Sequence, residues 1–313
     1  MRMNIDQLND DCLCIILEYL TLPDQIAMAR SSLRYEELLA EIVWRKPRYR
    51  EVSISDDMLA PLNKEDYIYF FKLTSTYMEK LYIWNVHDKA FDSYLGRHLM
   101  RPELAFYLCL NLNNLRELCV TDNYMNNSMI QNVTKSCPHL HSLSVSSAYI
   151  TGMFMVGLHN LQTLVARECS IEAEHLAELL AQLQLTTLDL TSNRYNLEQT
   201  ILEAPAAGLL RLQRLGISDA QDCGFRIAEQ LPQLKELVVS YHGVMAQDLH
   251  DMLDTTRQLV ESSDTKFPKR LQSIMCNVVD VEVALEQITG LETRCPRESP
   301  KFCEILKIIY KCK

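Results

Sequence analysis

Residues 115–120 read LRELCV, and this six-residue cassette recurs five more times further along the chain. Each copy has leucine at its first and fourth positions and an aliphatic residue at its sixth. The later copies are LHSLSV (140–145), LQTLVA (161–166), LTTLDL (185–190), LQRLGI (212–217) and LKELVV (234–239). Their starts lie 25, 21, 24, 27 and 22 residues apart. A single unit of this size cannot bury its own leucines, so successive units must stack and share one core.

A cassette repeated at this period resembles the leucine-rich repeat, in which each unit supplies one short strand and one return segment. The resemblance implies an α/β solenoid with parallel strands on its concave face and helices on its convex face. Three residues after each cassette the repeat favours asparagine or cysteine, because a small polar side chain there bonds neighbouring backbone groups. The residues at this turn position are Asn123, Ala148, Cys169, Asn193, Ala220 and His242.

The segments between cassettes place apolar residues at helical spacing, which predicts helices on the convex face. The clearest example is EAEHLAELLAQL (172–183), with its charges on the far side. The Cys137–Pro138 pair predicts that one helix stops before Pro138. The residues that share helical faces are Met129, Ile130 and Val133; Leu176, Leu179, Leu180 and Leu183; and Phe225, Ala228 and Leu231.

We predict that the solenoid covers residues 48–290, with clean repeats over about 112–244. Residues 291–313 follow it, and helical spacing of apolar residues there predicts a capping helix. A membrane-surface helix is the weaker alternative, because the apolar run is short and no arginine-rich face accompanies it. The degenerate cassettes are Tyr49-Val52-Ile54, Met78-Leu81-Ile83 and Leu271-Ile274-Cys276, and the apolar positions of the predicted capping helix are Phe302, Ile305, Leu306 and Ile309.

Bulk composition narrows the class of protein. The 313 residues carry a formal net charge of −10, which argues against a general nucleic-acid partner. No apolar run approaches the roughly 20 residues that span a bilayer, so we expect no membrane partner. The start of the sequence lacks an apolar signal region, and the eleven cysteines are scattered singly. These features favour reduced thiols in the cytosol or nucleus.

Neither a metal site nor a catalytic site is expected. Cys137, His139 and His141 lie close together, but no second ligand pair follows at zinc-finger spacing. The chain also lacks a glycine-rich phosphate loop and the Gly-x-Ser-x-Gly nucleophile motif. We therefore predict a chain that has no cofactor and is not itself an enzyme.

The first 47 residues carry no cassette and predict a module of three short helices. Asn9 or Asp10 can cap the first helix, and Pro23 opens the second. The third runs towards Trp44. Three short helices in about forty residues make a small core, so the module is expected to bury apolar surface against a partner.

This segment resembles the F-box. In the family pattern, Leu-Pro-acidic-acidic-x-Leu precedes further aliphatic positions, and an acidic residue opens the second helix. The chain departs from the pattern where Asn9 replaces proline, Ser31-Ser32 replaces a Val-Cys pair and Tyr35 replaces tryptophan. The residues that match the pattern in register are Leu8, Asp10, Asp11, Leu13, Ile16, Leu20, Leu22, Pro23, Asp24 and, at its end, Trp44.

An F-box followed by leucine-rich repeats implies the substrate-recognition subunit of a Skp–cullin–F-box ubiquitin ligase. In that family the F-box docks on a Skp-type adaptor, which links it to the cullin and RING subunits, and the repeats hold a protein substrate. The adaptor contacts that the resemblance implies are Leu8, Leu13, Ile16, Leu17, Leu20, Leu22, Pro23 and Ile26. The alternative for each of them is that it only fills the module's own core, because helix periodicity alone does not say which neighbour a face meets.

Strand alternation places the residues flanking the cassette leucines on the concave face, where a substrate would bind. This set is small and polar, which does not favour a strongly charged ligand. The larger side chains Tyr82 and Trp84 are further candidates for an interface anchor. The predicted substrate-binding residues are Thr121, Ser144, Ser146, Arg167, Asp189, Thr191, Arg214, Ser218, Ser240, Tyr241 and His242.

Two other classes of function stay open. The chain can be a leucine-rich-repeat interaction scaffold without a ligase role, in which the amino-terminal helices merely cap the solenoid. It can also resemble leucine-rich activators of small GTPases, although that reading needs longer, more uniform repeats and a charged rim.

Overall fold

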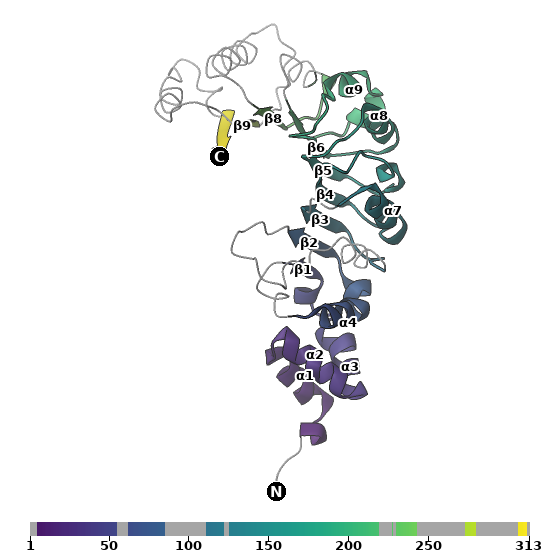
Figure 1. The fold of residues 1–313 in the computed structure, drawn as a ribbon, viewed down its shortest axis with the longest axis vertical. Coiled ribbons are helices and arrows are strands. Elements are labelled where there is room, and N and C mark those ends of the chain that lie inside the picture. Colours follow the sequence, from purple (N-terminus) through teal and green to yellow (C-terminus); the bar gives the residue numbers. More distant parts are fainter. Residues whose placement is uncertain are drawn as a thin grey trace. The chain divides into compact units, whose positions relative to one another are not determined.

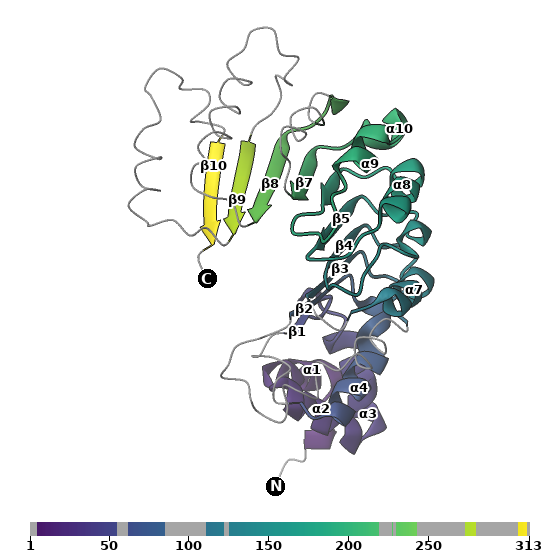
Figure 2. The same ribbon diagram turned by 45° about the horizontal axis from the view of Figure 1, so that its top comes forward.

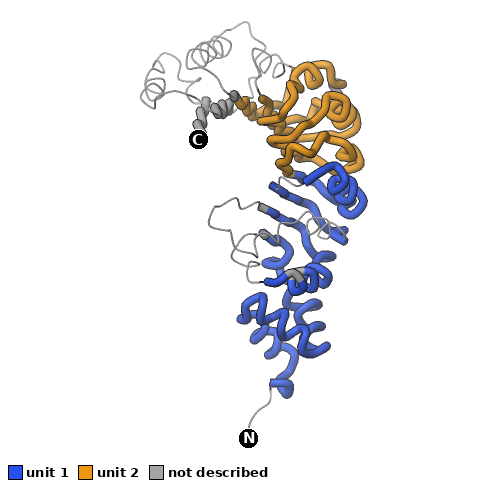
Figure 3. Tube along the Cα trace, viewed as in Figure 1, with its two compact units in different colours: residues 1–143 blue, residues 144–313 orange. Residues whose placement is uncertain are grey.

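The computed structural model describes residues 5–54, 62–84, 111–121, 125–218, 227, 230–242, 273–279 and 306–311. The chain forms two compact units, residues 1–143 and 144–313 (Figure 3). Both combine helices with parallel strands, so the α/β class and the repeat-like strand order predicted from the sequence are confirmed. The predicted division at residues 47 and 290 follows the sequence repeats and stays a prediction.

The first unit begins with the helical module (Figure 1). After a short 3-10 turn, Ile5–Gln7, it contains α1 (Asp10–Tyr19), α2 (Leu22–Ser31) and α3 (Leu33–Leu38), and α3 continues as a π-helix, Leu39–Val43. Asn9 caps α1 as predicted, because its Oδ1 accepts a hydrogen bond from the Cys12 N–H at 2.9 Å. The Thr21 hydroxyl caps α2, where Pro23 lies in the first turn.

A buried glutamine ties the helical module together. Gln25 Oε1 accepts hydrogen bonds from Trp44 Nε1 at 2.8 Å and from the Tyr49 hydroxyl at 3.0 Å. Its Nε2 donates to the Leu17 carbonyl at 2.9 Å, so both ends of the amide are satisfied. Trp44 is fully buried and packs edge-on against Phe70 of α4 (Lys64–Thr74), with ring centroids 5.3 Å apart. The module therefore shares its core with the first repeat.

Three parallel strands follow in the first unit: β1 (Glu51–Ile54), β2 (Lys80–Trp84) and β3 (Glu117–Thr121). Val52 is in register with Leu81, and Leu81 with Leu118, and all three are fully buried. The two degenerate cassettes before residue 100 are thus true strands. Short 3-10 turns, Pro47–Tyr49 and Ser75–Tyr77, precede β1 and β2, and α7 (Asn127–Ser136) follows β3.

Strand β4 (Ser142–Ser146) lies where the chain passes from the first unit to the second. The second unit then contains β5 (Thr163–Arg167), β6 (Thr187–Asp189), β7 (Arg214–Ser218), β8 (Glu236–His242), β9 (Ser273–Val279) and β10 (Leu306–Lys311). These strands pair in parallel and in chain order (Figure 2). The return segments form a 3-10 turn, Met155–Gly157, and the helices α8 (Ala173–Gln182), α9 (Glu198–Glu203) and α10 (Ala206–Leu209).

Stacked leucines form the core of the second unit. Leu164, Leu188, Leu215 and Leu237 are neighbours in register, and each is fully buried. Leu188 and Leu215 are therefore flanked by leucines of the repeats on either side, and Leu237 lies between Leu215 and Ile274 of β9, as the stacking of repeats predicts. Among the predicted helix faces, those of α7 and α8 are confirmed, whereas Phe225 and Ala228 lie outside the described residues.

The turn position behaves as expected where it holds asparagine. The Asn193 side chain donates to the carbonyls of Ala166 at 2.7 Å and Leu190 at 3.0 Å, and it accepts from the Ile171 N–H at 3.1 Å. Cys169 Sγ donates to the Arg167 carbonyl at 3.2 Å. Asn193 therefore links the backbone of its own repeat to that of the repeat before it. Asn123, Ala220 and the side chain of His242 lie outside the described residues.

The predicted capping helix at the end of the chain is wrong over Leu306–Lys311. This segment forms strand β10, and Leu306 is in register with Ile274 of β9. The sequence LKIIYK is rich in β-branched and aromatic residues, which favour strands. The edge of β9 supplies backbone hydrogen-bond partners along the whole segment, whereas an isolated helix of this length is marginal in water.

Candidate functional site

Helix α1 has an exposed apolar stripe on the surface of the first unit. Cys12, Ile15, Ile16 and Tyr19 follow the i, i+3, i+4, i+7 spacing that places residues on one helical face. The exposed fractions are 58% for Ile15, 37% for Ile16 and 88% for Tyr19, and Cys12 is exposed as well. We call these four residues the outer stripe of α1.

The opposite side of α1 is also apolar, and it is this side that the module buries. Leu13 and Leu17 are almost completely inaccessible, as are Leu22 and Ile26 of α2. For these four residues the predicted adaptor contact is wrong, because their side chains fill the core of the module itself. The other four predicted contacts, Leu8, Ile16, Leu20 and Pro23, are half-buried or exposed, and adaptor contact there stays a prediction.

The sequence prediction missed Ile15 and Tyr19, although α1 carried a signal for them. Its sequence, DDCLCIILEY, has only one charged residue after the first two positions. A helix that is apolar on all sides is normally covered on all sides. The core of a three-helix module can cover only one side of α1, so the second apolar face was the feature to follow.

The two ends of α1 are held by charged side chains from later in the chain, Arg34 of α3 and Lys46 in the bend before the 3-10 turn Pro47–Tyr49. Near the start of the helix, Arg34 donates to the Asp10 carboxylate at 2.7 Å and to the carbonyls of Asp6 at 2.7 Å and Leu8 at 2.8 Å. Near its end, Lys46 forms an ion pair with Glu18. These contacts fix α1 on the module, so the outer stripe is presented on a preorganised element.

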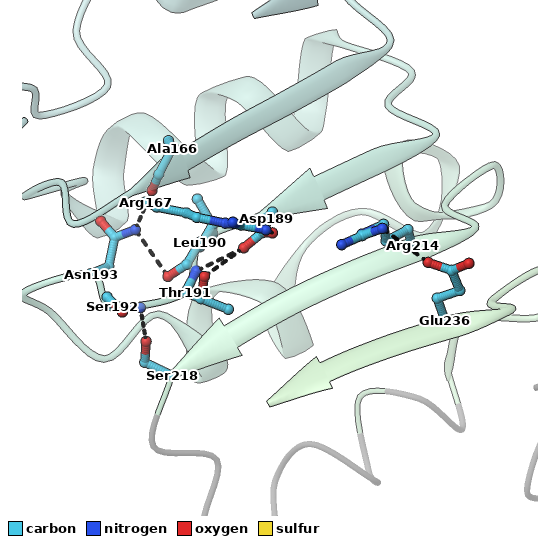
Figure 4. Close-up of polar contacts among 10 residues, drawn as sticks. All are labelled: Ala166, Arg167, Asp189, Leu190, Thr191, Ser192, Asn193, Arg214, Ser218 and Glu236. Carbon is cyan, nitrogen blue, oxygen red and sulfur yellow. Dashed lines mark hydrogen bonds and ion pairs between the residues drawn. The ribbon is translucent and has the colours of Figure 1, made fainter. Parts of the chain in front are cut away.

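The second unit presents a polar surface beside its buried leucines. Thr163, Thr187, Arg214 and Glu236 are register neighbours at the start of β5 to β8, and all are partly exposed. Arg214 Nη1 lies 3.1 Å from Glu236 Oε2, and this ion pair is drawn in Figure 4. The row has one charge of each sign and no dominant patch.

A fully buried carboxylate lies among these strands. Asp189 Oδ2 accepts from Arg167 Nε at 3.0 Å and Nη2 at 2.5 Å, and Oδ1 accepts from the backbone N–H and the hydroxyl of Thr191 at 3.1 and 2.8 Å (Figure 4). Burial by itself raises the pKa of Asp189, but the hydrogen bonds and charge of Arg167, with the bonds from Thr191, hold this pKa below its ordinary value. Asp189 is therefore ionised at neutral pH, and Arg167 neutralises its charge.

Gly216 makes room for this carboxylate. It is the register neighbour of Asp189, and a Cβ atom at Gly216 would lie only 2.5 Å from Asp189 Oδ1. A hydrogen bond also connects these two repeats, because the Ser192 N–H donates to the Ser218 hydroxyl (Figure 4). The turn after β6 is thus tied to the end of β7.

This arrangement corrects part of the predicted substrate surface. Asp189, Thr191 and Ser240 are buried, so their predicted contact with a substrate is wrong. Arg167 remains exposed on one side while it covers Asp189. The remaining predicted residues divide into two groups. Thr121, Ser144, Ser146, Arg214 and Ser218 are partly exposed, whereas the side chains of Tyr241, His242 and Trp84 lie outside those described.

The residues considered for a metal site have different surroundings. Cys137 is buried at the end of α7, and burial raises the pKa of its thiol to about 12, so it stays protonated. His139 and His141 are exposed. Within the described ranges no three His, Cys, Asp or Glu side chains converge as a metal ion requires. Nor does any helix there have the length and apolar character needed to span a membrane.

No protein family model matches the chain, and no curated protein matches it. Among solved structures, it is similar to an internalin (inlF) from Listeria monocytogenes, with 16% sequence identity and a TM-score of 0.35. The match covers 71% of this chain and 64% of the internalin chain, so this chain spans less than two thirds of that protein. Such a likeness carries no argument about function.

Proposed function

We propose that this chain is a non-catalytic, substrate-recruiting subunit of a cullin–RING ubiquitin ligase. In this proposal the outer stripe of α1 docks on a Skp-type adaptor, and the polar strand surface of the repeats binds a protein substrate in the cytosol or nucleus. The observation that carries the proposal is the exposure of Ile15, Ile16 and Tyr19 in the chain on its own. The resemblance of residues 8–44 to the F-box supplies the identity of the partner.

The physical argument starts from the cost of leaving the outer stripe in water. Each fully buried aliphatic or aromatic side chain gains roughly 1.5–3 kcal/mol relative to exposure, so covering this stripe with a partner is favourable. An exposed tyrosine beside isoleucines is also typical of interface anchors. The fixed ends of α1 reduce the conformational entropy lost on binding. This combination supports docking of a protein with an apolar groove.

The repeats would contribute binding and no chemistry. Their partly exposed threonines, serines and paired charges can hydrogen-bond a protein surface. Holding a substrate on the same chain that binds the adaptor raises the effective concentration of the substrate's lysines near the charged ubiquitin-conjugating enzyme. The transfer reaction itself then belongs to other subunits.

The adaptor proposal is tested by titrating the purified full chain with a purified Skp-type adaptor in a calorimeter. Ile16→Asp places a charge in the middle of the outer stripe, and we expect the affinity to fall at least about a hundredfold, because an unpaired charge would be buried. Tyr195→Asp, at an exposed aromatic of the second unit, is the matched control and should bind like the unchanged chain. Equal binding by both variants would disprove docking through α1.

A repeat scaffold without a ligase role is the second candidate. The polar surface of the second unit can hydrogen-bond a protein partner without an adaptor. If the unchanged chain forms no complex with the adaptor at micromolar concentrations, the scaffold role replaces the ligase role. Stimulation of a small GTPase by the purified chain would instead favour the activator class.

A further inference from the structure

The first unit contains a cavity that the adaptor proposal does not use. Its volume is about 670 Å³, which is within the range of small-molecule sites. Three arginines (Arg45, Arg50 and Arg116) and two histidines (His139 and His141) line it. None of the residues of the outer stripe of α1 is among them. Such a gathering of cationic and donor side chains is unexpected in a chain whose net charge is −10.

The repeat itself builds the wall of this cavity. Arg50, Glu79, Arg116 and His141 each stand one residue before a strand, β1 to β4 respectively. Their backbones form a ladder, with N–H to carbonyl distances of 2.9 Å from Glu79 to Arg50, 2.7 Å from Arg116 to Glu79 and 2.8 Å from His141 to Arg116. The side chains therefore project from neighbouring backbone positions that are already hydrogen-bonded to one another, so no backbone rearrangement is needed to bring them to one ligand.

The charges of the cavity are only partly compensated. Arg50 Nη1 lies 3.2 Å from Glu79 Oε1, and Arg45 forms an ion pair with Glu41. Arg116 is exposed and has no ion-pair partner among the described residues. Two acidic residues thus face three arginines, which leaves an excess of positive charge.

One donor of Arg45 is also unused. Its guanidinium stacks on the Tyr77 ring, 4.3 Å from the centroid, and donates to the Tyr77 hydroxyl. Its Nε is buried and makes no hydrogen bond. A buried donor without an acceptor costs roughly 1–3 kcal/mol, and a ligand that draws the guanidinium towards the cavity would remove that cost.

We infer that this cavity binds a phosphate monoester. A guanidinium offers paired N–H donors that match the oxygens of phosphate, and arginine is over-represented wherever such recognition occurs. A single carboxylate would need only one arginine, whereas the dianion of a phosphate monoester suits several arginines together with the imidazole of His139 and the second N–H of Asn114, whose Nδ2 also donates to the Thr76 carbonyl at 2.6 Å. The phosphate can belong to a phosphorylated residue of a partner protein or to a free phosphate compound.

The test is calorimetric titration of the full chain with inorganic phosphate and with the peptide acetyl-Gly-Gly-phosphoserine-Gly-Gly-amide. Sodium acetate at equal ionic strength measures the non-specific contribution of charge. We expect phosphate to bind with a dissociation constant in roughly the millimolar range, or tighter. Arg116→Gln should weaken that binding about tenfold, because it removes the uncompensated guanidinium. Arg116→Lys should restore part of it.

Lys235→Gln is the matched control. Lys235 stands one residue before β8 in the second unit, as Arg116 stands before β3, so this substitution removes the same charge away from the cavity. Lys235→Gln should leave phosphate binding unchanged. Arg116→Gln and Lys235→Gln should both unfold at the temperature of the unchanged chain. A peptide that binds at least tenfold more tightly than phosphate identifies a phosphoprotein as the source, and equal affinity identifies a free phosphate compound. Equal phosphate affinity in the unchanged chain and Arg116→Gln, or no binding beyond that of acetate, would overturn the site.

Discussion

The helical module of the first unit and the strand repeats of the second solve the same burial problem in opposite ways. In the repeats the buried leucines of β5 to β8 are flanked by aliphatic residues of the neighbouring strands, and most of the exposed positions around them are polar. In the module α1 is apolar on two faces, of which only the face with Leu13 and Leu17 is covered. Side chains outside the core are available for binding a partner. In the repeats these exposed side chains are mostly polar, whereas in the module the exposed side of α1 is apolar.

The cause of the difference is the number of neighbours. A repeat has a like repeat on each side, so its apolar row is buried by periodicity alone. A module of three short helices has only one core, which cannot enclose a helix from all directions. Gln25 shows how small that core is, because its side chain reaches the backbone of α1, the ring of Trp44 and the hydroxyl of Tyr49.

The comparison is broken most directly by truncating one apolar residue in each region. Leu188→Ala removes a fully buried side chain between Leu164 and Leu215, and we expect a loss of about 3 kcal/mol in the free energy of unfolding. Ile15→Ala in the outer stripe should change it by less than about 0.5 kcal/mol. Urea unfolding followed by circular dichroism measures both. Similar losses would mean that the outer stripe is part of a core.

Gln25→Leu probes the small core of the module. The change leaves Trp44 Nε1 and the Tyr49 hydroxyl without their shared acceptor, so we expect a loss of about 2 kcal/mol. Adding Tyr49→Phe should return part of it, since one orphaned donor disappears. Gln182→Leu, at an exposed position of α8, is the control and should be nearly neutral. Urea unfolding again provides the measurement, and a neutral Gln25→Leu would show that the amide is not the link.

Asp189→Asn tests whether the buried charge stabilises the second unit. The pKa of Asp189 is lowered in the folded chain, so its ionised form contributes stability above the ordinary aspartate pKa of about 3.9, and this is lost as the pH falls through the lowered value. We expect the variant to be about 1–2 kcal/mol less stable at pH 7, with the gap closing below about pH 4. Unfolding measured from pH 7 to pH 2 follows the gap. A gap that is constant over this range would exclude the charge as its cause.

Arg214→Gln has the smallest expected effect. The Arg214–Glu236 pair is partly exposed on both sides, so its removal should cost about 0.5 kcal/mol or less. High salt should erase even this difference, because exposed pairs are screened. A loss above 1 kcal/mol in thermal or urea unfolding would show that the polar rows, and not only the leucines, hold the repeats together.

Sequence periodicity was sufficient where the same environment recurs. The cassette leucines, the strands of the degenerate repeats and the hydrogen bonds of Asn193 follow from it, because each repeat imposes nearly the same surroundings on the next. It failed at Asp189, which alternation places on the surface. The space left by its neighbour Gly216 and the cover supplied by Arg167 are contacts between repeats, and no pattern within one repeat contains them.

The ends of the chain escaped prediction for a different reason. Apolar residues of Leu306–Lys311 fit a helix as well as a strand over so short a length, and the paired edge of β9 decided between them. For α1 the sequence predicted an apolar helix but not which face would be inside. Four of the predicted adaptor contacts, Leu13, Leu17, Leu22 and Ile26, are buried in the core. The prediction did not include Ile15 and Tyr19, which are more exposed.

The exposed guanidinium of Arg167 looks suited to bind an acidic ligand. Its hydrogen bonds to Asp189 instead disfavour such a ligand. An incoming carboxylate that captured Arg167 would strip a sealed anion of its counter-charge and be repelled by it at close range. The buried carboxylate of Asp189 therefore affects which ligands can bind at this part of the repeats. Neutral or basic segments can bind against β5 and β6 without this cost. Acidic segments are repelled by Asp189, an effect that the exposed side chains alone do not show.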